Sequence, residues 1–385
     1  MDHSNNIYAA FKISEEIGTH PDNLEILESV RKAAQNYQKI AFGVNCPQGI
    51  DELIKVKIGG IDQWLHIRGR NKEKPLLLVL HGGPGYPMIG TMDSIQRPWE
   101  DFFTVVQWDQ RQTGKSYFSI ADDTDIPSIS EMIADTEEVI EYLLNYLNHK
   151  KLFLLGHSWG TVLGMHMVKQ HPDQLYAFVG VGQVVNMLEN ERVMFDRLLH
   201  HANSKGDDKL VNILKDIAPY PNEKSPAKHF IEYGEFIRRE LSRLAGETMV
   251  HYLDFDEEEK LRAYLQLISP HLTPEDISNY QSDEKIALYL EPYSLTKDLF
   301  SIDLPRQLGS KFDVPIFFFT GFYDWHTPKV LSENWFSKIK TRHKKLVTFY
   351  DSSHFVFSEE PGRFLYELVH QVLPLSNDGC RDLIG

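Results

Sequence analysis

The chain has 385 residues, of which 42% are hydrophobic and 25% charged, as in an ordinary globular protein. A chain of this length buries about three quarters of the surface that its unfolded form exposes, so it needs no disulfide framework. With 40 basic and 55 acidic residues, its formal net charge of -15 repels phosphate backbones and anionic lipid headgroups. These values exclude a disordered or collagen-like chain and argue against a nucleic-acid partner.

The amino-terminal residues and the two cysteines narrow the class further. Residues 1–20 have neither the basic region nor the apolar region of a signal peptide. The longest apolar runs are far shorter than the roughly 18–20 residues of a membrane helix. Cys46 and Cys380 have neither a metal-ligand spacing nor that of a disulfide framework. We therefore expect a soluble, cytoplasmic protein with no membrane partner and no metal.

Residues 1–50 are expected to form a polar, helix-rich extension, and a hairpin with its turn at Gly59-Gly60 follows. Residues 130–148 carry apolar side chains at three- and four-residue spacing, which predicts an amphipathic helix that opens at Ser130. Strands that alternate with helices favour an open α/β sheet. Short apolar runs typical of strands buried on both faces occur at residues 75–80, 103–108, 151–156 and 176–182.

A helical region interrupts this alternation at residues 183–308. Its sequence is charged and turn-rich, and it contains no convincing strand. Strand-like runs return at residues 314–321 and 345–350, and a last helix is expected at about residues 363–372. The predicted organisation is an extension at 1–50, a core divided between 51–182 and 309–385, and a helical insertion at 183–308.

The sequence Gly156-His157-Ser158-Trp159-Gly160 carries the main chemical signal. It directly follows the apolar run LFLL and directly precedes a stretch that can be helical. A G-x-S-x-G pattern between a strand and a helix is typical of a nucleophile elbow, in which small residues allow a serine to occupy a strained turn. The pattern favours Ser158 as a nucleophile over an ordinary turn serine.

A nucleophilic serine needs a base that removes its proton and an acid that orients the base. The chain order expected with such an elbow is serine, acid and then histidine. Asp324 and His354 each follow a predicted strand, where catalytic groups gather in open α/β sheets. His326 is the alternative base, on the same loop as the acid. Asp313 and Asp351 are the less favoured acids.

A glycine-rich segment, His81-Gly82-Gly83-Pro84-Gly85, directly follows the run at residues 75–80. Glycines here allow a backbone N–H group to approach a developing oxyanion, and the residue after the nucleophile supplies a second donor. We expect Gly83 and Trp159 to form this oxyanion hole. The phosphate-loop patterns GxxxxGK[ST] and GxGxxG do not occur here, so a turn with structural glycines is the alternative.

With HGGPG, WDQRQTGKS and GHSWG in this order, the sequence resembles the proline iminopeptidase family of α/β-hydrolases from about Leu53 to Val372. The resemblance implies an α/β-hydrolase fold in which residues 183–308 are a cap over the cleft. The family typically cleaves an N-terminal residue, often proline, from short peptides or amides, and it uses no metal or cofactor. The implied site is the triad Ser158, Asp324 and His354, the oxyanion hole of Gly83 and Trp159, and a buttress at Asp109-Gln110-Arg111.

The sequence departs from the family pattern at two points. Gln112 stands where the family usually has the glycine of DQRG. The family's aminopeptidases bind the free amine of the substrate with cap glutamates, one often beside a tryptophan, but no tryptophan lies in the predicted cap. The cap offers Glu232, Glu235 and Glu291 as amine ligands, and solvated helix faces are the plainer interpretation of these residues.

Three functions follow from these residues. The first is an aminopeptidase of the proline iminopeptidase type, which cleaves a short peptide through an acyl-enzyme. The second is a carboxylesterase on the same scaffold, acting on an uncharged ester or lactone. The third is a non-catalytic binding protein, and the presence of all three triad residues argues against it.

Overall fold

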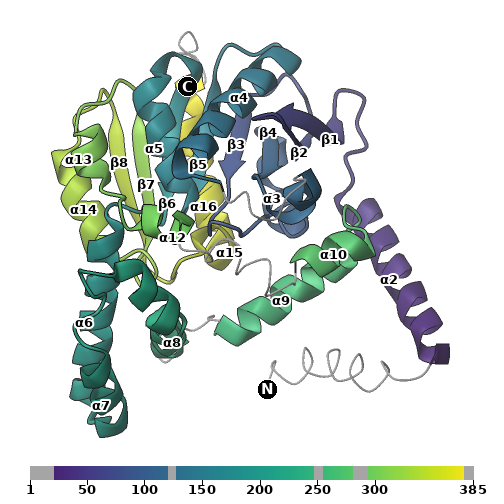
Figure 1. The fold of residues 1–385 in the computed structure, drawn as a ribbon. Helices are drawn as coiled ribbons and strands as arrows, with labels where there is room; N and C mark the ends of the chain where they lie inside the picture. Colours follow the sequence, from purple (N-terminus) through teal and green to yellow (C-terminus); the bar gives the residue numbers. More distant parts are fainter. Residues whose placement is uncertain (1–20, 120–126, 247–254, 281–293, 377–385) are drawn as a thin grey trace.

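The computed structural model describes residues 21–119, 127–246, 255–280 and 294–376 (Figure 1). At its centre is an eight-stranded sheet in the order β1-β2-β4-β3-β5-β6-β7-β8. The strands are β1 (Ile50–Ile58), β2 (Ile61–Gly69), β3 (Leu76–Leu80), β4 (Thr104–Asp109), β5 (Leu152–His157), β6 (Leu175–Val181), β7 (Ile316–Gly321) and β8 (Lys344–Phe349). β2 pairs antiparallel with β1 and β4, and all other neighbours are parallel. The predicted α/β fold is confirmed.

The predicted hairpin is formed by β1 and β2, which pair from Ile50 opposite Gly69 to Ile58 opposite Ile61. Gly59 and Gly60 make its turn with φ of 57° and 81°, a left-handed conformation that side chains disfavour. Each apolar run of the sequence corresponds to one of the parallel strands, and every residue of β3, β4, β5 and β7 is buried. These runs are continuous because helices cover both faces of the sheet.

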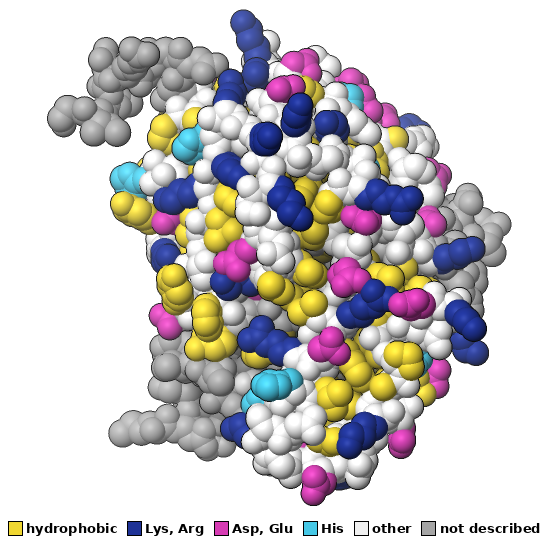
Figure 2. Space-filling view, turned by 90° about the vertical axis from the view of Figure 1, so that its left-hand side faces the viewer, with side chains coloured by type: hydrophobic (Ala, Val, Ile, Leu, Met, Phe, Trp, Pro, Cys, Tyr) yellow, Lys and Arg dark blue, Asp and Glu magenta, His cyan; other side chains and the backbone are white. Residues whose placement is uncertain are grey.

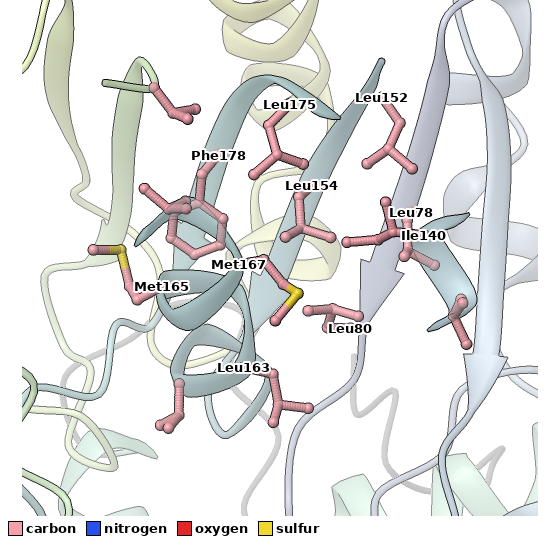
Figure 3. Close-up of a cluster of buried hydrophobic side chains, with 14 of the residues drawn as sticks. Leu78, Leu80, Ile140, Leu152, Leu154, Leu163, Met165, Met167, Leu175 and Phe178 are labelled. Carbon is pink, nitrogen blue, oxygen red and sulfur yellow. The ribbon is translucent and has the colours of Figure 1, made fainter. Parts of the chain in front are cut away.

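The helices α4 (Ile129–Tyr146) and α5 (Gly160–Gln170) pack on one face of the sheet. Figure 3 shows Leu154 of β5 and Phe178 of β6 beside Met167 of α5. A Cβ atom at Gly164 of α5 would overlap the ring of Phe178, so the glycine allows helix and strand to approach closely. This packing fixes the start of α5 against the end of β5.

The opposite face is covered by α3 (Asp93–Gln96), α15 (Val356–Glu359) and α16 (Pro361–Glu367). A π turn at Leu368–Val372 continues the last of these, in the region where the sequence predicts one helix. Trp99 and Phe364 are both buried here, with ring centroids 5.2 Å apart. Full burial of such a side chain contributes about 1.5–3 kcal/mol.

The start of α4 differs from the prediction. Ser128 caps the helix. Its hydroxyl accepts a hydrogen bond from the backbone N–H of Glu131, and its own backbone N–H donates to the side-chain carboxylate of Glu131. This reciprocal pair is a capping box, which satisfies two backbone donors that the helix leaves free. The helix therefore begins one residue before the predicted start at Ser130, and its cap is Ser128.

The described residues between β6 and β7 form helices and no strand of the sheet. We call residues 183–308 the cap. Leu198, Leu214, Ile237 and Leu241 are buried in a separate hydrophobic cluster of the cap. The helices are α6 (Met187–Lys205), α7 (Asp208–Ile217), α8 (Pro226–Gly246), α9 (Phe255–Ile268), α10 (Pro274–Tyr280), α12 (Ser294–Leu299) and α13 (Leu304–Leu308), and α14 (Lys329–Lys338) follows β7.

The amino-terminal helix α2 (Pro21–Phe42) packs against the cap, beside α9 and α10 in Figure 1. The guanidinium of Arg31 donates to the carbonyl oxygens of Leu267 and Leu272 at 3.1 and 3.2 Å. The side-chain amide of Gln35 donates to the carbonyl oxygen of Ser269 at 2.8 Å. This helix therefore holds the link between α9 and α10.

On the face in Figure 2, basic and acidic side chains are interspersed with hydrophobic ones. None of the helices within the described ranges combines the length and the apolar sequence that crossing a bilayer demands. Cys46 has a free thiol, and Cys380 lies outside the described residues.

Candidate active site

Ser158 occupies the tight turn between β5, which ends at His157, and α5, which begins at Gly160. Its φ is 52°, in the left-handed region that non-glycine residues rarely adopt. The turn is held because the N–H of Ser158 donates to the carbonyl oxygen of Val181 at 2.8 Å. A strained serine between a strand and a helix is the geometry of a nucleophile elbow.

The two glycines of the G-x-S-x-G pattern are required by close backbone contacts. A Cβ atom at Gly156 would lie 2.5 Å from the carbonyl oxygen of Gly160. A Cβ atom at Gly160 would overlap the carbonyl oxygen of Leu80 on β3. Any side chain at either position would push the elbow away from the sheet.

Asp324 follows β7, His354 follows β8, and the two side chains form a buried pair. Nδ1 of His354 lies 3.0 Å from Oδ2 of Asp324. The same carboxylate accepts from the hydroxyl of Thr327 at 2.8 Å and from the backbone N–H groups of His326 and Thr327 at 3.0 and 2.8 Å. With both oxygens engaged, the carboxylate has one orientation.

Burial alone would raise the pKa of Asp324. The neighbouring charge of His354, its hydrogen bond and the N–H of Thr327 outweigh burial and hold that pKa below its usual value. The ionised carboxylate accepts a hydrogen bond from the Nδ1–H group of His354, so Nε2 of the imidazole carries no proton and is an acceptor. This is the tautomer that a general base needs.

His326, the alternative base, has a different place. Its backbone N–H binds Asp324, whereas its ring packs on that of His354 with centroids 4.9 Å apart. Burial, and then the charges of His354 and Arg238, lower the pKa of His326 to about 3. The less favoured acids, Asp313 and Asp351, are exposed.

The loop of His354 lies beside the elbow and beside the end of β6. Nε2 of His157, the residue before the nucleophile, lies 3.1 Å from the carbonyl oxygen of His354. A Cβ atom at Gly182, which follows the strand that binds the elbow, would lie 2.9 Å from Cε1 of His354. Ser158, Asp324 and His354 therefore gather at the carboxyl ends of β5, β7 and β8, where open α/β sheets bind ligands.

The glycine-rich loop after β3 passes beside the nucleophile. A Cβ atom at Gly82 would lie 3.3 Å from that of Ser158. Gly83 is exposed and has φ of 111°, which only glycine adopts readily. Trp159 directly follows the serine at the start of α5. The glycine-rich loop and the start of α5 therefore both lie next to Ser158, and the oxyanion hole of Gly83 and Trp159 stays a prediction.

Gln110 connects this loop to the elbow. Its backbone N–H donates to Nε2 of His81 at 3.2 Å, and its side-chain amide donates to the carbonyl oxygen of His81. The same side chain accepts from the indole N–H of Trp159 at 3.1 Å. Burial lowers the pKa of His81 to about 3, so its imidazole stays a neutral acceptor. Gln110 is therefore hydrogen-bonded both to the glycine-rich loop, at His81, and to the residue after the nucleophile, Trp159.

The neighbouring Arg111 and Gln112 complete this buttress. The guanidinium of Arg111 donates to both oxygens of Asp135 at 2.8 Å, which ties the segment to α4. Gln112 has φ of 61°. This left-handed turn explains why the family pattern places a glycine here, and the glutamine adopts it at some conformational cost.

The structure places two of the three predicted cap glutamates on one exposed helix. Glu232 and Glu235 lie exposed on α8, and Glu235 pairs with Arg239 at 2.9 Å. Glu291 lies outside the described residues.

A buried cap carboxylate is instead present at Glu191 on α6, which the sequence analysis missed. It pairs with Arg238 at 2.5 Å and accepts from the hydroxyl of Tyr220 at 2.8 Å. Its neighbour Asn190 donates to the carbonyl oxygen of His326 at 2.8 Å. Glu191 shares helical spacing with the buried Leu198 of the cap core, a signal that could have revealed it.

Comparison with known proteins agrees with this geometry. Residues 75–210 match the alpha/beta hydrolase fold family. The chain is 32% identical over 312 residues to the probable aminopeptidase YbaC of Bacillus subtilis (strain 168), an alignment that covers 80% of this chain and 92% of that protein. The chain belongs to the proline iminopeptidase family of α/β-hydrolases. The family prediction from HGGPG and GHSWG is confirmed.

Two further proteins are similar to this chain, one in part of its sequence and one in its fold. A proline iminopeptidase of Lactobacillus helveticus (strain DPC 4571) is 31% identical over 128 residues, which cover 32% of this chain and 41% of that protein. The crystal structure of a proline iminopeptidase-related protein from Thermus thermophilus superposes with a TM-score of 0.57 at 20% identity, covering 85% of this chain and 99% of that one. As a family member, the chain is an α/β-fold hydrolase.

Proposed function

We propose that this hydrolase is an aminopeptidase that releases an N-terminal residue from short peptides through an acyl-enzyme on Ser158. The observation that carries the proposal is the buried pair of Asp324 and His354 in contact with the elbow of a strained serine. A nucleophile, its base and the group that orients the base are the requirements of acyl transfer. The probable aminopeptidase activity in the name of the Bacillus subtilis relative supports the choice of peptide substrates.

The proposed reaction has two steps. Oγ of Ser158 attacks the amide carbonyl while Nε2 of His354 takes the hydroxyl proton, and the N–H groups of Gly83 and Trp159 bind the oxyanion. The tetrahedral intermediate collapses when His354 gives the proton to the leaving amine. Water, activated by the same histidine, then releases the acyl group. Asp324 holds the imidazole in the required tautomer throughout, and no metal or cofactor takes part.

A carboxylesterase is the second candidate, and the state of Glu191 favours it. An aminopeptidase must pair the ammonium group of its substrate with a carboxylate, because an unpaired buried charge is costly. Glu191 is buried next to the residue that binds the loop of Asp324, but Arg238 already neutralises it. Glu232, Glu235 and Glu291 remain the candidates for the amine site in the first proposal.

A paired hydrolysis assay distinguishes the two candidates. Wild type and Ser158→Ala are given prolyl-naphthylamide with a free amine and the same compound with an acetylated amine. An aminopeptidase cleaves the free-amine compound with strong preference. Ser158→Ala should lower kcat by about 10⁴-fold or more, whereas the exposed control Ser337→Ala should not. Hydrolysis of only a short-chain nitrophenyl ester by wild type would establish the esterase. Full activity of Ser158→Ala would refute both.

A further inference from the structure

Two histidines and an aspartate converge outside the catalytic residues. His66 lies on β2, Asp93 on α3, and His271 in the link between α9 and α10. One potential ligand atom of each residue lies within 4.8 Å of the other two. We propose that these three side chains bind a divalent transition-metal ion, with Zn²⁺ as the best match, and that the metal fastens the cap to the sheet.

The hydrogen bond on the far side of His66 orients its ring. Nε2 of His66 lies 3.0 Å from Oδ1 of Asp51, so this nitrogen donates its proton to that carboxylate. Nδ1 then carries a lone pair; it is buried, has no hydrogen-bond partner in the described structure, and lies 3.9 Å from Oδ1 of Asp93. Two acceptors that face one another attract a cation between them. A carboxylate behind a ligating imidazole is also the usual outer partner of a metal-bound histidine.

His271 presents a second nitrogen to the same carboxylate. Its buried Nε2 lies 2.8 Å from Oδ2 of Asp93, yet the geometry is not that of a hydrogen bond. Its ring lies over that of His66 with centroids 4.1 Å apart and an interplanar angle of 53°. Both imidazoles therefore turn a nitrogen towards Asp93, that of His66 beyond hydrogen-bond distance and that of His271 at ion-pair distance.

The separations suit a small, borderline-soft ion. Zn²⁺ binds imidazole nitrogen and carboxylate oxygen at about 2.0–2.2 Å, which places neighbouring ligand atoms of a tetrahedron roughly 3.4 Å apart. Nδ1 of His66 lies 3.9 Å from Oδ1 of Asp93 and Nε2 of His271 lies 2.8 Å from Oδ2, so small shifts of these side chains would bring one oxygen and the two nitrogens to that spacing. Two imidazoles and one carboxylate are a common zinc donor set, with water in the fourth position. The side chains of Asp93 and His271 are 12% and 15% exposed, which leaves a path for the ion.

Arg68 is the positive charge that could oppose a metal here. Its guanidinium lies 2.9 Å from Oδ1 of Asp93. The same guanidinium lies 3.1 Å from Glu100 and 3.8 Å from Asp51, so two further carboxylates share its charge. Asp93 keeps Oδ2 on the side of His271. One oxygen of Asp93 therefore still faces the cluster.

The metal would act on the position of the cap. The carbonyl groups of Ser269 and Leu272, on either side of His271, are held by α2. On α9, Arg262 lies over the ring of Tyr86, next to the glycine-rich loop, with 3.5 Å from Cζ to the ring centroid. A metal ion bound by His271, His66 and Asp93 would therefore hold the link between α9 and α10 against β2 and α3, beside the glycine-rich loop.

Metal binding to the purified, chelator-treated full chain tests the proposal directly. Titration with ZnCl₂, followed by calorimetry and by elemental analysis after dialysis, should give one zinc ion per chain. Added Zn²⁺ should raise the thermal midpoint, and Co²⁺ should give the visible absorption of a tetrahedral site. His271→Ala should lose the site, and the control His149→Ala should keep it, because this half-buried histidine lies outside the cluster and its Nε2 is 3.2 Å from the carbonyl oxygen of Lys72. Asp51→Asn should weaken binding by about 10–100-fold, since it removes the partner of His66.

The rival explanation is an ion pair between a protonated His271 and Asp93 with no metal. In that case wild type and His271→Ala bind equally little Zn²⁺, and the thermal midpoint does not respond to the ion. That result would overturn the proposal. So would an equal loss of binding in His149→Ala, which would mean that surface histidines hold the metal. Should His271→Ala not fold, Asp93→Asn provides the same comparison. None of these measurements depends on hydrolase activity.

Discussion

Replacement of Asp324 by asparagine tests the role of the buried acid with little change in shape. The carboxylate accepts two backbone N–H groups on Oδ1, and on Oδ2 it accepts the hydroxyl of Thr327 and Nδ1 of His354. Asparagine can keep its oxygen towards the backbone groups. Its NH₂ group then faces Nδ1 of His354 as a donor, so the imidazole must move its proton to Nε2. That tautomer cannot accept the proton of Ser158.

The loss should be large and confined to catalysis. A triad held in the wrong tautomer loses about 10⁴-fold in kcat, which is roughly 5.4 kcal/mol of transition-state stabilisation at 1.36 kcal/mol per tenfold. Steady-state kinetics on the preferred substrate measures kcat, and thermal denaturation checks that the variant is folded. Asp351→Asn is the matched control, because this aspartate is exposed and precedes the same histidine loop. A folded Asp324→Asn within tenfold of wild-type kcat would refute this account of the acid.

Three further predictions concern stability, measured by denaturant unfolding. Gly160→Ala should lower the free energy of unfolding by about 1–3 kcal/mol, since the new methyl group overlaps the carbonyl oxygen of Leu80 on β3. An unchanged free energy of unfolding would contradict this close contact. Glu191→Gln should lower the free energy of unfolding by about 3–5 kcal/mol, because it leaves Arg238 buried without its charge partner. The control Glu235→Gln, at an exposed pair, should lower it by at most about 1 kcal/mol. Similar losses in the two variants would argue against a buried pair. The depressed pKa of His81, about 3 against 6.5, gives stability that is present above pH 6.5 and lost on acidification. Wild type should therefore have a lower free energy of unfolding at pH 5 than at pH 8, and His81→Gln should reduce this difference by about 2 kcal/mol. An unchanged difference would mean that His81 is not held neutral.

The sheet and the elbow could be predicted because their signals are local. A strand covered on both faces must be apolar along its length, and the runs at β3, β4, β5 and β7 are buried throughout. The elbow needs glycines on both sides of its serine because β3 and α5 leave no room for a Cβ atom. Each requirement leaves a pattern within a few residues of sequence.

Features that depend on distant pairing could not be predicted in the same way. In the sequence, only the expected order of strands and loops distinguishes Asp324 from Asp313 and Asp351. The pairing of Glu191 with Arg238, and the convergence of His66 with His271, join segments that no spacing rule connects. Exposed positions of the cap, such as Glu232, have no local pattern that separates a ligand from a solvated helix face.

The central claim is that Ser158 is an activated nucleophile, and covalent labelling tests it most directly. Wild type and Ser158→Ala are incubated with a fluorophosphonate, and the adduct is located by intact-protein mass spectrometry and peptide mapping. The account predicts a single adduct on Ser158 in wild type and none in the alanine variant. An unlabelled wild type, or an adduct that persists in Ser158→Ala, would contradict it.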